Sequence, residues 1–220
     1  MSRPVTWSLT LDAADADGIS LSQTPAVAGN LTITGALATG GVATMDDARR
    51  VRVTTVADES AKTLTIYGTN HDGNAIVESM TGPNATTGDT GLDFKTVTRV
   101  AVSAAFTDAV TVGTNGVGST KWFKANPHIS PSHISFMIVV TGTVNYDIEH
   151  TLDNPDMPAN MLEANNTAIP TVFNHATIAA QTANVTDSYI SPVRGARLTL
   201  NSGTGTAEVT FLQAGISGNM

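Results

Sequence analysis

Histidines are the first candidates for chemistry in this 220-residue sequence, because an imidazole can act as a general base or bind a metal ion. No two of them have the His-x-His or His-x-x-x-His spacing that would place a pair of ligands side by side. We interpret His150, which alternates with apolar residues, as a core side chain hydrogen-bonded through a ring nitrogen, and His71 as part of a turn. The histidines are His71, His128, His133, His150 and His175.

Acidic residues offer a second kind of site. The run Asp15-Ala16-Asp17-Gly18 matches the start of a calcium-binding loop, in which oxygen ligands recur at alternate positions. The last position of such a loop needs a bidentate Glu, and this sequence has Ala26 there. We therefore predict a solvated turn. The pairs Asp46-Asp47 and Asp58-Glu59 stand beside predicted turns, where exposed acids are common, and are assigned no role.

A glycine-rich run, Gly113 to Gly118, resembles a phosphate-binding loop only superficially. It lacks a Gly-Lys-Ser/Thr ending, and no helix follows whose N-terminus could hold an anion, so we predict a hairpin turn. Four large rings could stack on sugars, but they lie far apart in the sequence, and burial accounts for most of them. These rings are Trp7, Tyr67, Trp122 and Tyr189.

Cysteine is absent from the sequence, which excludes disulfides, thiolate catalysis and Cys-ligated metals. The sequence also shows no local signature of a catalytic triad. We therefore predict that the protein is not an enzyme. We assign no catalytic, cofactor-binding or metal-binding residue and expect no cofactor.

The elements that carry these residues should be β-strands. Hydrophobic residues make up 41% of the chain and charged residues 14%, which indicates a packed protein rather than a disordered one. The 34 threonines, beside 19 glycines and four lysines, favour strands and turns over helices. A formal net charge of -8 disfavours nucleic acid as a partner, because phosphate binding depends on Lys and Arg.

Neither a membrane span nor a secretory signal is expected. The longest apolar run, Phe136 to Val140, has the length of a strand rather than of a transmembrane segment. The N-terminal residues have one basic residue but no apolar core, and acidic residues follow quickly. We expect the chain to be made, and used or assembled, in the cytoplasm.

Apolar and polar residues alternate in short segments from Asn30 onwards, as in half-buried strands. Pro127 and Pro131 indicate a domain junction. We predict an all-β fold with two tandem antiparallel β-sandwich or jelly-roll-like domains. The predicted parts are an extended N-terminal arm (residues 1–29), a first β domain (residues 30–124) and a second β domain (residues 125–220).

Two hairpins are predicted within these domains. One turns at Asn70 to Asn74, where Asn, Asp and Gly tolerate a positive φ. The other joins residues 196–201 to residues 207–213 through Ser202-Gly203-Thr204-Gly205-Thr206, and it has the clearest hairpin pattern in the chain.

A series of turns and strand ends runs along nearly the whole chain. It comprises Asp15–Ile19, Gly40–Thr44, Gly68–Asn74, Gly82–Asn84, Phe94–Thr98, Val112–Gly116, Val140–Val144, Glu149–Thr151, Phe173–His175, Pro192–Val193, Ser202–Gly205 and Gln213–Gly215. In this combination the sequence resembles a group of virion structural proteins of tailed bacteriophages. The resemblance implies a structural component of the particle, with no active-site residues to carry over.

The same resemblance implies a capsid decoration or cement protein that binds the outside of the major capsid protein lattice and stabilises the particle. Expected partners are the major capsid protein and copies of the chain itself in a homo-oligomer, but neither nucleic acid nor membrane. The expected location is the virion, after assembly in the host cytoplasm. The alternatives are a head-to-tail connector or tail protein forming a ring, and a host-glycan-binding module. Thr-rich, Lys-poor strand edges lack the charges that usually block edge pairing, so neighbouring subunits could cover them.

Overall fold

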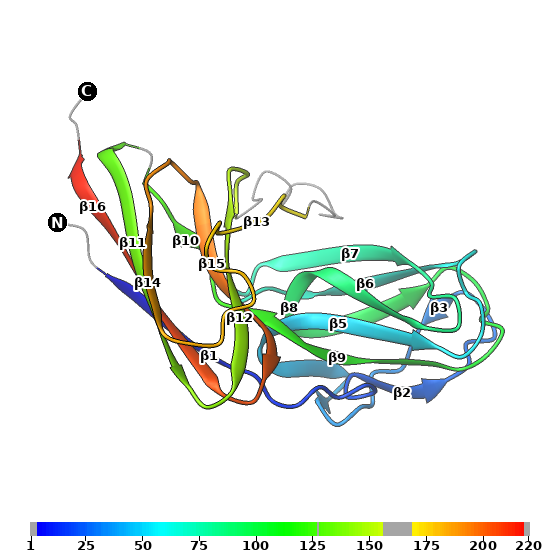
Figure 1. The fold of residues 1–220 in the computed structure, drawn as a ribbon. Helices are drawn as coiled ribbons and strands as arrows, with labels where there is room; N and C mark the ends of the chain where they lie inside the picture. The colour runs from blue at the N-terminus through cyan, green and yellow to red at the C-terminus, as the bar shows by residue number, and fades with distance from the viewer. Residues whose placement is uncertain (1–3, 127, 156–168, 218–220) are drawn as a thin grey trace. The chain divides into compact units, whose positions relative to one another are not determined.

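The structure is a computed structural model that describes residues 4–126, 128–155 and 169–217 (Figure 1). Its described elements are β-strands, and they pair antiparallel. The chain forms two compact units. We call residues 4–11, 119–155 (without 127) and 170–217 the terminal unit, and residues 12–118 with Ile169 the inserted unit. The predicted all-β, antiparallel class is confirmed.

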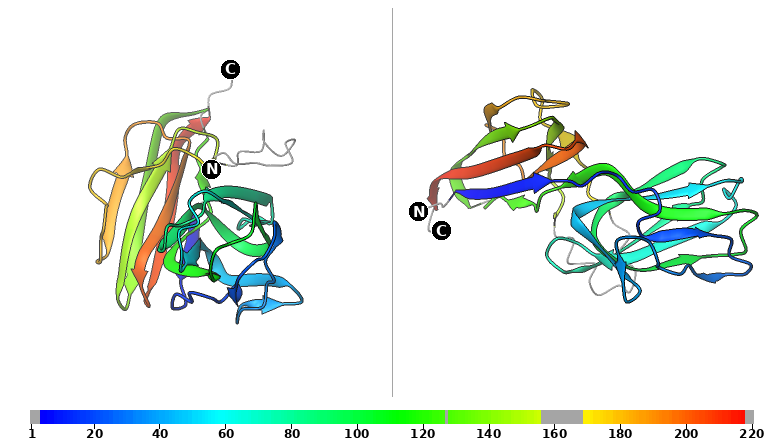
Figure 2. Two further views of the ribbon diagram at one scale, coloured as in Figure 1. Left: turned by 90° about the vertical axis from the view of Figure 1, so that its right-hand side faces the viewer. Right: turned by 90° about the horizontal axis from the view of Figure 1, so that it is seen from below.

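The terminal unit is a β-sandwich, in which a sheet of order β1-β16-β11-β14 faces a sheet of order β13-β12-β15-β10 (Figure 2). Alternate residues of facing strands, such as Phe136, Phe211, Tyr146 and Leu198, fill the core between the sheets. The strands are β1 (Val5–Thr10), β10 (Phe123–Lys124), β11 (Ile129–Thr141), β12 (Val144–Thr151), β13 (Phe173–Asn174), β14 (Val185–Tyr189), β15 (Gly195–Gly203) and β16 (Thr206–Ser217).

The predicted hairpin between residues 196–201 and 207–213 is wrong. β15 pairs with β12 and β10, whereas β16 pairs with β1 and β11, so residues 204–205 carry the chain from one sheet to the other. The β11–β12 connection at Gly142 crosses in the same way, and Gly205 donates its backbone N–H to the Thr143 carbonyl at 3.0 Å. Apolar and polar residues alternate in the sequences of both β15 and β16, and this alternation alone does not show which sheet a strand joins.

The inserted unit has the strand order β2-β9-β5-β8-β6-β7, with β3 beside β8 and β4 beside β5. The predicted hairpin at residues 70–74 is confirmed as the turn between β6 and β7; Gly73 has a φ of 78° there. The strands are β2 (Ser20–Gln23), β3 (Gly29–Asn30), β4 (Ala38–Thr39), β5 (Val42–Thr55), β6 (Thr63–Thr69), β7 (Ala75–Thr81), β8 (Thr87–Val102) and β9 (Val110–Ser119).

Irregularities in the β5–β8 pairing let these two long strands bend around the core. The register shifts between Thr44 and Arg49 and again between Arg50 and Arg52. At the second shift, the Thr90 hydroxyl accepts the backbone N–H of Val51 at 2.9 Å, so a side chain replaces a missing backbone bond. Both halves of each strand therefore turn apolar side chains into one core.

The N-terminal arm predicted over residues 1–29 is corrected by the structure. Val5 to Thr10 form β1, which pairs with β16 from Val5 opposite Phe211 to Thr10 opposite Thr206. Leu9 and Ile19 are fully buried, one in each core. A strand whose partner is some 200 residues away in sequence gives no local signal of pairing, and this segment therefore looked like a free end.

The unit boundaries also differ from the predicted domains. The inserted unit begins at Asp12 rather than at residue 30, and residues 119–124, which were predicted in the first domain, belong to the terminal unit. Phe123 packs in the terminal core against Phe211, with ring centroids 5.1 Å apart. The two units are thus nested in the chain rather than tandem. None of the described residues forms a helix long and apolar enough to cross a membrane.

Candidate interaction surface

The structure brings His150 and His175 together, although nothing in their sequence spacing indicates it. Both rings contact Tyr189, with centroids 5.2 Å and 4.8 Å from it in T-shaped geometry. Phe136 closes the cluster against His175, at 5.2 Å. His150 was predicted to be a core side chain bonded through a ring nitrogen, but it is half-buried and its Nδ1 atom makes no hydrogen bond. Its ring packs instead against Tyr189 of β14.

This aromatic cluster leaves polar atoms without partners. The Nδ1 atom of His150 and the hydroxyl of Tyr189 are buried and make no hydrogen bond. Burial, and to a smaller extent the charge of His175, lowers the pKa of His150, while burial raises the pKa of Tyr189. Both groups are therefore held neutral. Among the described residues, no group of three or more His, Asp or Glu side chains gathers as a metal site would require.

The other predicted candidates are dispersed. His71 lies 3.2 Å from Asp47 in the inserted unit, and His128 and His133 are exposed. The Asp15 carboxylate accepts the backbone N–H of Asp17 at 3.3 Å, as expected for a turn. The four large rings do not contact one another but pack on different partners; Trp7, for example, meets Phe211 at 6.2 Å.

Two further predictions from the sequence, a turn at Gly113 to Gly118 and an exposed Glu59, are wrong. Gly113 to Gly118 is not a turn but part of β9, and a Cβ on Gly113 would lie 2.0 Å from the Asp15 carbonyl oxygen. Glycine is required there by this close approach. Glu59 is not an exposed acid: it is buried, pairs with Lys62 and accepts the backbone N–H of Thr107 at 2.7 Å. Its carboxylate thereby anchors the loop at residues 107–108.

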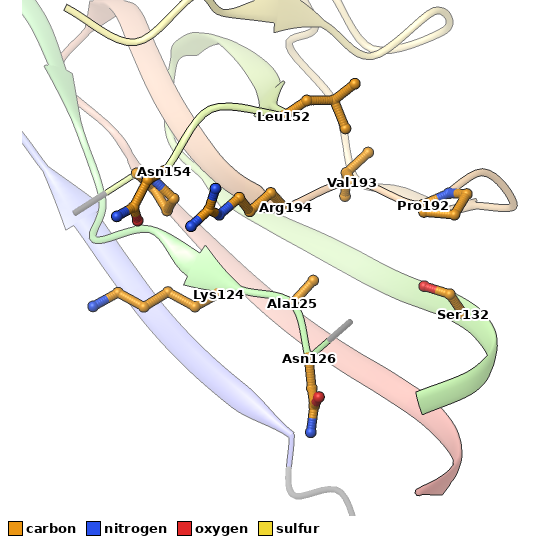
Figure 3. Close-up of a pocket in the computed structure, with 10 residues that line it drawn as sticks. Lys124, Ala125, Asn126, Ser132, Leu152, Asn154, Pro192, Val193 and Arg194 are labelled. Atoms are coloured by element: carbon orange, nitrogen blue, oxygen red, sulfur yellow. The ribbon is translucent and has the colours of Figure 1, made fainter. Parts of the chain in front are cut away.

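A pocket of about 590 Å³ opens in the terminal unit, between β10, the end of β12 and the segment before β15 (Figure 3). The charged ends of Lys124 and Arg194 extend toward the same side, near Asn154. Its described lining includes these cations and no acidic residue, in a chain with 19 acids. The lining residues are Lys124, Ala125, Asn126, Ser132, Leu152, Asn154, Pro155, Pro192, Val193 and Arg194.

A regular surface of the terminal unit is the exposed side of the β1-β16-β11-β14 sheet, which we call the outer face. Met137, Val139 and Leu212 are 44%, 38% and 39% exposed on it. They lie among hydroxyl groups, and at the described positions of this face Glu208 is the one acidic residue. The outer-face residues are Thr6, Ser8, Thr10, His133, Ser135, Met137, Val139, Thr141, Thr186, Ser188, Thr206, Glu208, Thr210, Leu212 and Ala214.

Cross-strand hydroxyl pairs order this face. Thr6 bonds Thr210 at 2.8 Å and Thr10 bonds Thr206 at 2.7 Å, each between the two side-chain oxygens. Paired hydroxyls hold neighbouring strands in register while leaving further lone pairs for an outside partner. No protein-family model matches the chain, and no curated protein matches it.

Proposed function

We propose that this chain is a non-enzymatic structural protein of a tailed-phage virion, and specifically a capsid decoration protein that binds the outside of the major capsid protein lattice and stabilises the particle. The outer face carries this proposal. It is a regular sheet surface on which apolar side chains stand among neutral hydroxyls, in a chain whose net charge is -8.

Such a composition suits a stable but non-obligate protein contact. Interfaces of that kind are about as apolar as the rest of a protein surface, and their centres are depleted in charge. Met137 lies diagonally across from Leu212 on neighbouring strands, because Met137 pairs with Thr210 and Ser135 with Leu212. These two side chains supply an apolar centre, and the surrounding threonines supply a hydrogen-bonding rim.

The test is co-sedimentation with capsids in the immature, expanded and emptied states, together with the heat resistance of the particle. We expect binding to the expanded lattice, a Met137→Asp variant that binds at least tenfold more weakly, and a Val56→Asp control that binds normally. Val56 is 64% exposed in the inserted unit, so its change adds the same charge elsewhere. Failure to bind any capsid state would refute the proposal. About six or twelve copies per particle would indicate instead the ring of a connector or tail.

A second function, binding of a host glycan, is favoured by the pocket alone. Arg194 contributes a cation to its described lining, and Leu152, Pro155 and Val193 give it an apolar wall, so an acidic sugar fits better than a neutral one. Calorimetry should show binding of a uronic-acid oligosaccharide that Arg194→Gln abolishes and Arg52→Gln leaves intact. Equal binding of neutral oligosaccharides, or no binding, would eliminate this function.

A further inference from the structure

Met137 is an oxidisable side chain at the apolar centre of the outer face. The chain has seven methionines and no cysteine, so thioethers are its most readily oxidised side chains. Three methionines lie among the described residues. Met137 is 44% exposed, whereas Met45 is 2% exposed and Met80 is partly buried against the core of the inserted unit. An oxidant in solution therefore reaches the sulfur of Met137 more easily than that of the other two.

The neighbours of Met137 can hold an oxidised side chain on the outer face. The register of β11 places Met137 between Thr186 of β14 and Thr210 of β16, one directly opposite on each side. Side chains in such positions have Cβ atoms about 5 Å apart and point to the same side of the sheet. A sulfoxide oxygen accepts hydrogen bonds, and a threonine hydroxyl can donate one. The sheet can therefore carry the oxidised residue without leaving its polar group unpaired.

We propose that Met137 is a reversible oxidation site, and that its sulfoxide weakens docking through the outer face while leaving the fold intact. The effect on docking rests on the capsid role proposed above. The oxidant is hydrogen peroxide: the thioether sulfur attacks one peroxide oxygen, and the S–O bond forms as the O–O bond breaks. The proton on the transferred oxygen passes to the departing hydroxide, which leaves as water. The sulfur loses two electrons, and the peroxide gains them.

Oxidation changes the character of the apolar centre. Met137 and Leu212 lie diagonally on neighbouring strands, and Val139 follows on β11 with its side chain on the same face. A partner that covers these side chains removes the sulfoxide from water. Burying such a polar group costs free energy unless the partner supplies a donor. The thioether form of Met137 is therefore the form that docks.

The first measurement is peptide mass spectrometry of the full chain treated with hydrogen peroxide. We expect Met137 to form its sulfoxide at least tenfold faster than Met45 and also faster than Met80, because both are less exposed. The oxidised chain should keep its β-sheet circular dichroism. Equal rates at Met137 and Met45, or a β-sheet spectrum that peroxide abolishes in the original chain but not in a Met137→Leu variant, would overturn the proposal.

The second measurement is co-sedimentation with expanded capsids before and after peroxide treatment, scored as the ratio of the two affinities within each variant. This ratio removes any effect of a substitution on binding before oxidation. We expect at least a tenfold loss in the original chain and in the Met80→Leu control. We expect no loss in Met137→Leu, which keeps an apolar side chain of similar volume without a sulfur atom.

Reversal is measured on the same samples. Methionine sulfoxide reductase with a dithiol should restore binding, because the dithiol becomes a disulfide as the sulfoxide oxygen leaves in water. Failure to restore binding would overturn the reversibility, and an equal loss on oxidation in Met137→Leu would overturn the effect on docking.

Absence of capsid binding before oxidation refutes the capsid role alone, because the selectivity of oxidation is read without capsids. Retention on a hydrophobic interaction column then tests the change in the outer face. Peroxide should shorten the retention of the original chain more than that of Met137→Leu, and an equal change in both would refute the loss of the apolar centre.

Discussion

Arg49 is a cation almost entirely removed from water, and its contacts explain why the inserted unit contains it. Its Nη2 atom donates to the carbonyl of Asp12 at 2.9 Å and to that of Asn115 at 2.8 Å, and its Nη1 lies 3.2 Å from the Asp46 carboxylate. Only Nε has no partner. One side chain thus ties the entry and the exit of the inserted unit together.

Replacing Arg49 by Met should destabilise the inserted unit by about 3 kcal/mol, because two buried carbonyls and a carboxylate lose their donor. Arg52→Met is the control. Arg52 is 36% exposed in its pair with Asp89 at 2.7 Å, and an exposed pair contributes less than about 1 kcal/mol. Urea unfolding, followed by hydrogen exchange of peptides from residues 12–118, measures the stability of the inserted unit in both variants. Similar losses of unfolding free energy in the two variants would show that Arg49 does not tie the two ends of the inserted unit together.

His150 gives the terminal unit a dependence on pH. Because burial and the charge of His175 lower the pKa of His150 below 6.5, the unfolded chain binds the proton more readily than the folded one. The stability that neutral His150 contributes to the folded terminal unit is therefore fully present above the pKa of His150 in the unfolded chain. It is lost as the pH falls through the lower pKa of His150 in the folded chain. The His150→Phe variant should lose less stability than the original protein between pH 7 and 5. The His128→Phe variant, changed at an exposed position, should lose as much as the original protein. Thermal unfolding followed by tryptophan fluorescence tests this, since Trp7 and Trp122 both lie in the terminal unit.

At the scale of elements, β9 depends on a glycine that no turn requires. Thr114 donates its backbone N–H to the Asp15 carbonyl at 2.7 Å, which brings the chain at residues 15–16 directly over Gly113. A Gly113→Ala change would force two backbone segments apart and should cost about 3 kcal/mol. At Gly29 an added Cβ meets nothing within 4 Å, so Gly29→Ala should be nearly neutral. Equal shifts in the urea midpoint would show that the contact over β9 is unimportant.

Strand positions and burial could be read from the sequence where they follow a period of two. Ile134, Phe136 and Ile138 alternate and are buried, and the turn at residues 70–74 follows from its Asn and Gly content. Pairing could not be read in the same way. β15 and β16 have the sequence pattern of a hairpin and nevertheless join different sheets, because an alternation of apolar and polar residues does not show which strand is the neighbour.

The candidate site was harder to foresee for the same reason. Met137 and Leu212 come together on the outer face only through the β11–β16 register, and Thr6 and Thr10 join that face only because β1 pairs with β16. The sequence indicated neutral, Thr-rich edges, but not the sheet to which they belong. Long-range pairing is the information that local patterns lack.

At the scale of the whole chain, the nested order of the units predicts that residues 12–118 fold on their own. The core of the inserted unit, from Ile19 to Val112, is drawn from within that range. Its two ends already meet: Asp15 donates its N–H to the Thr114 hydroxyl at 3.1 Å, and Arg49 holds Asp12 and Asn115. A segment with adjacent, tied ends has the form expected of an independently folding insertion.

We expect the isolated 12–118 segment to give a cooperative urea transition and a dispersed amide spectrum, whereas deletion of residues 1–11 should unfold the terminal unit. That deletion removes β1, and with it the strand that covers one side of β16 and the buried side chain of Leu9. In the deleted chain, fluorescence of Trp122 should report an unfolded terminal unit while the inserted unit keeps its β-sheet circular dichroism. A random-coil spectrum for the 12–118 segment would show instead that the inserted unit needs the rest of the chain to fold.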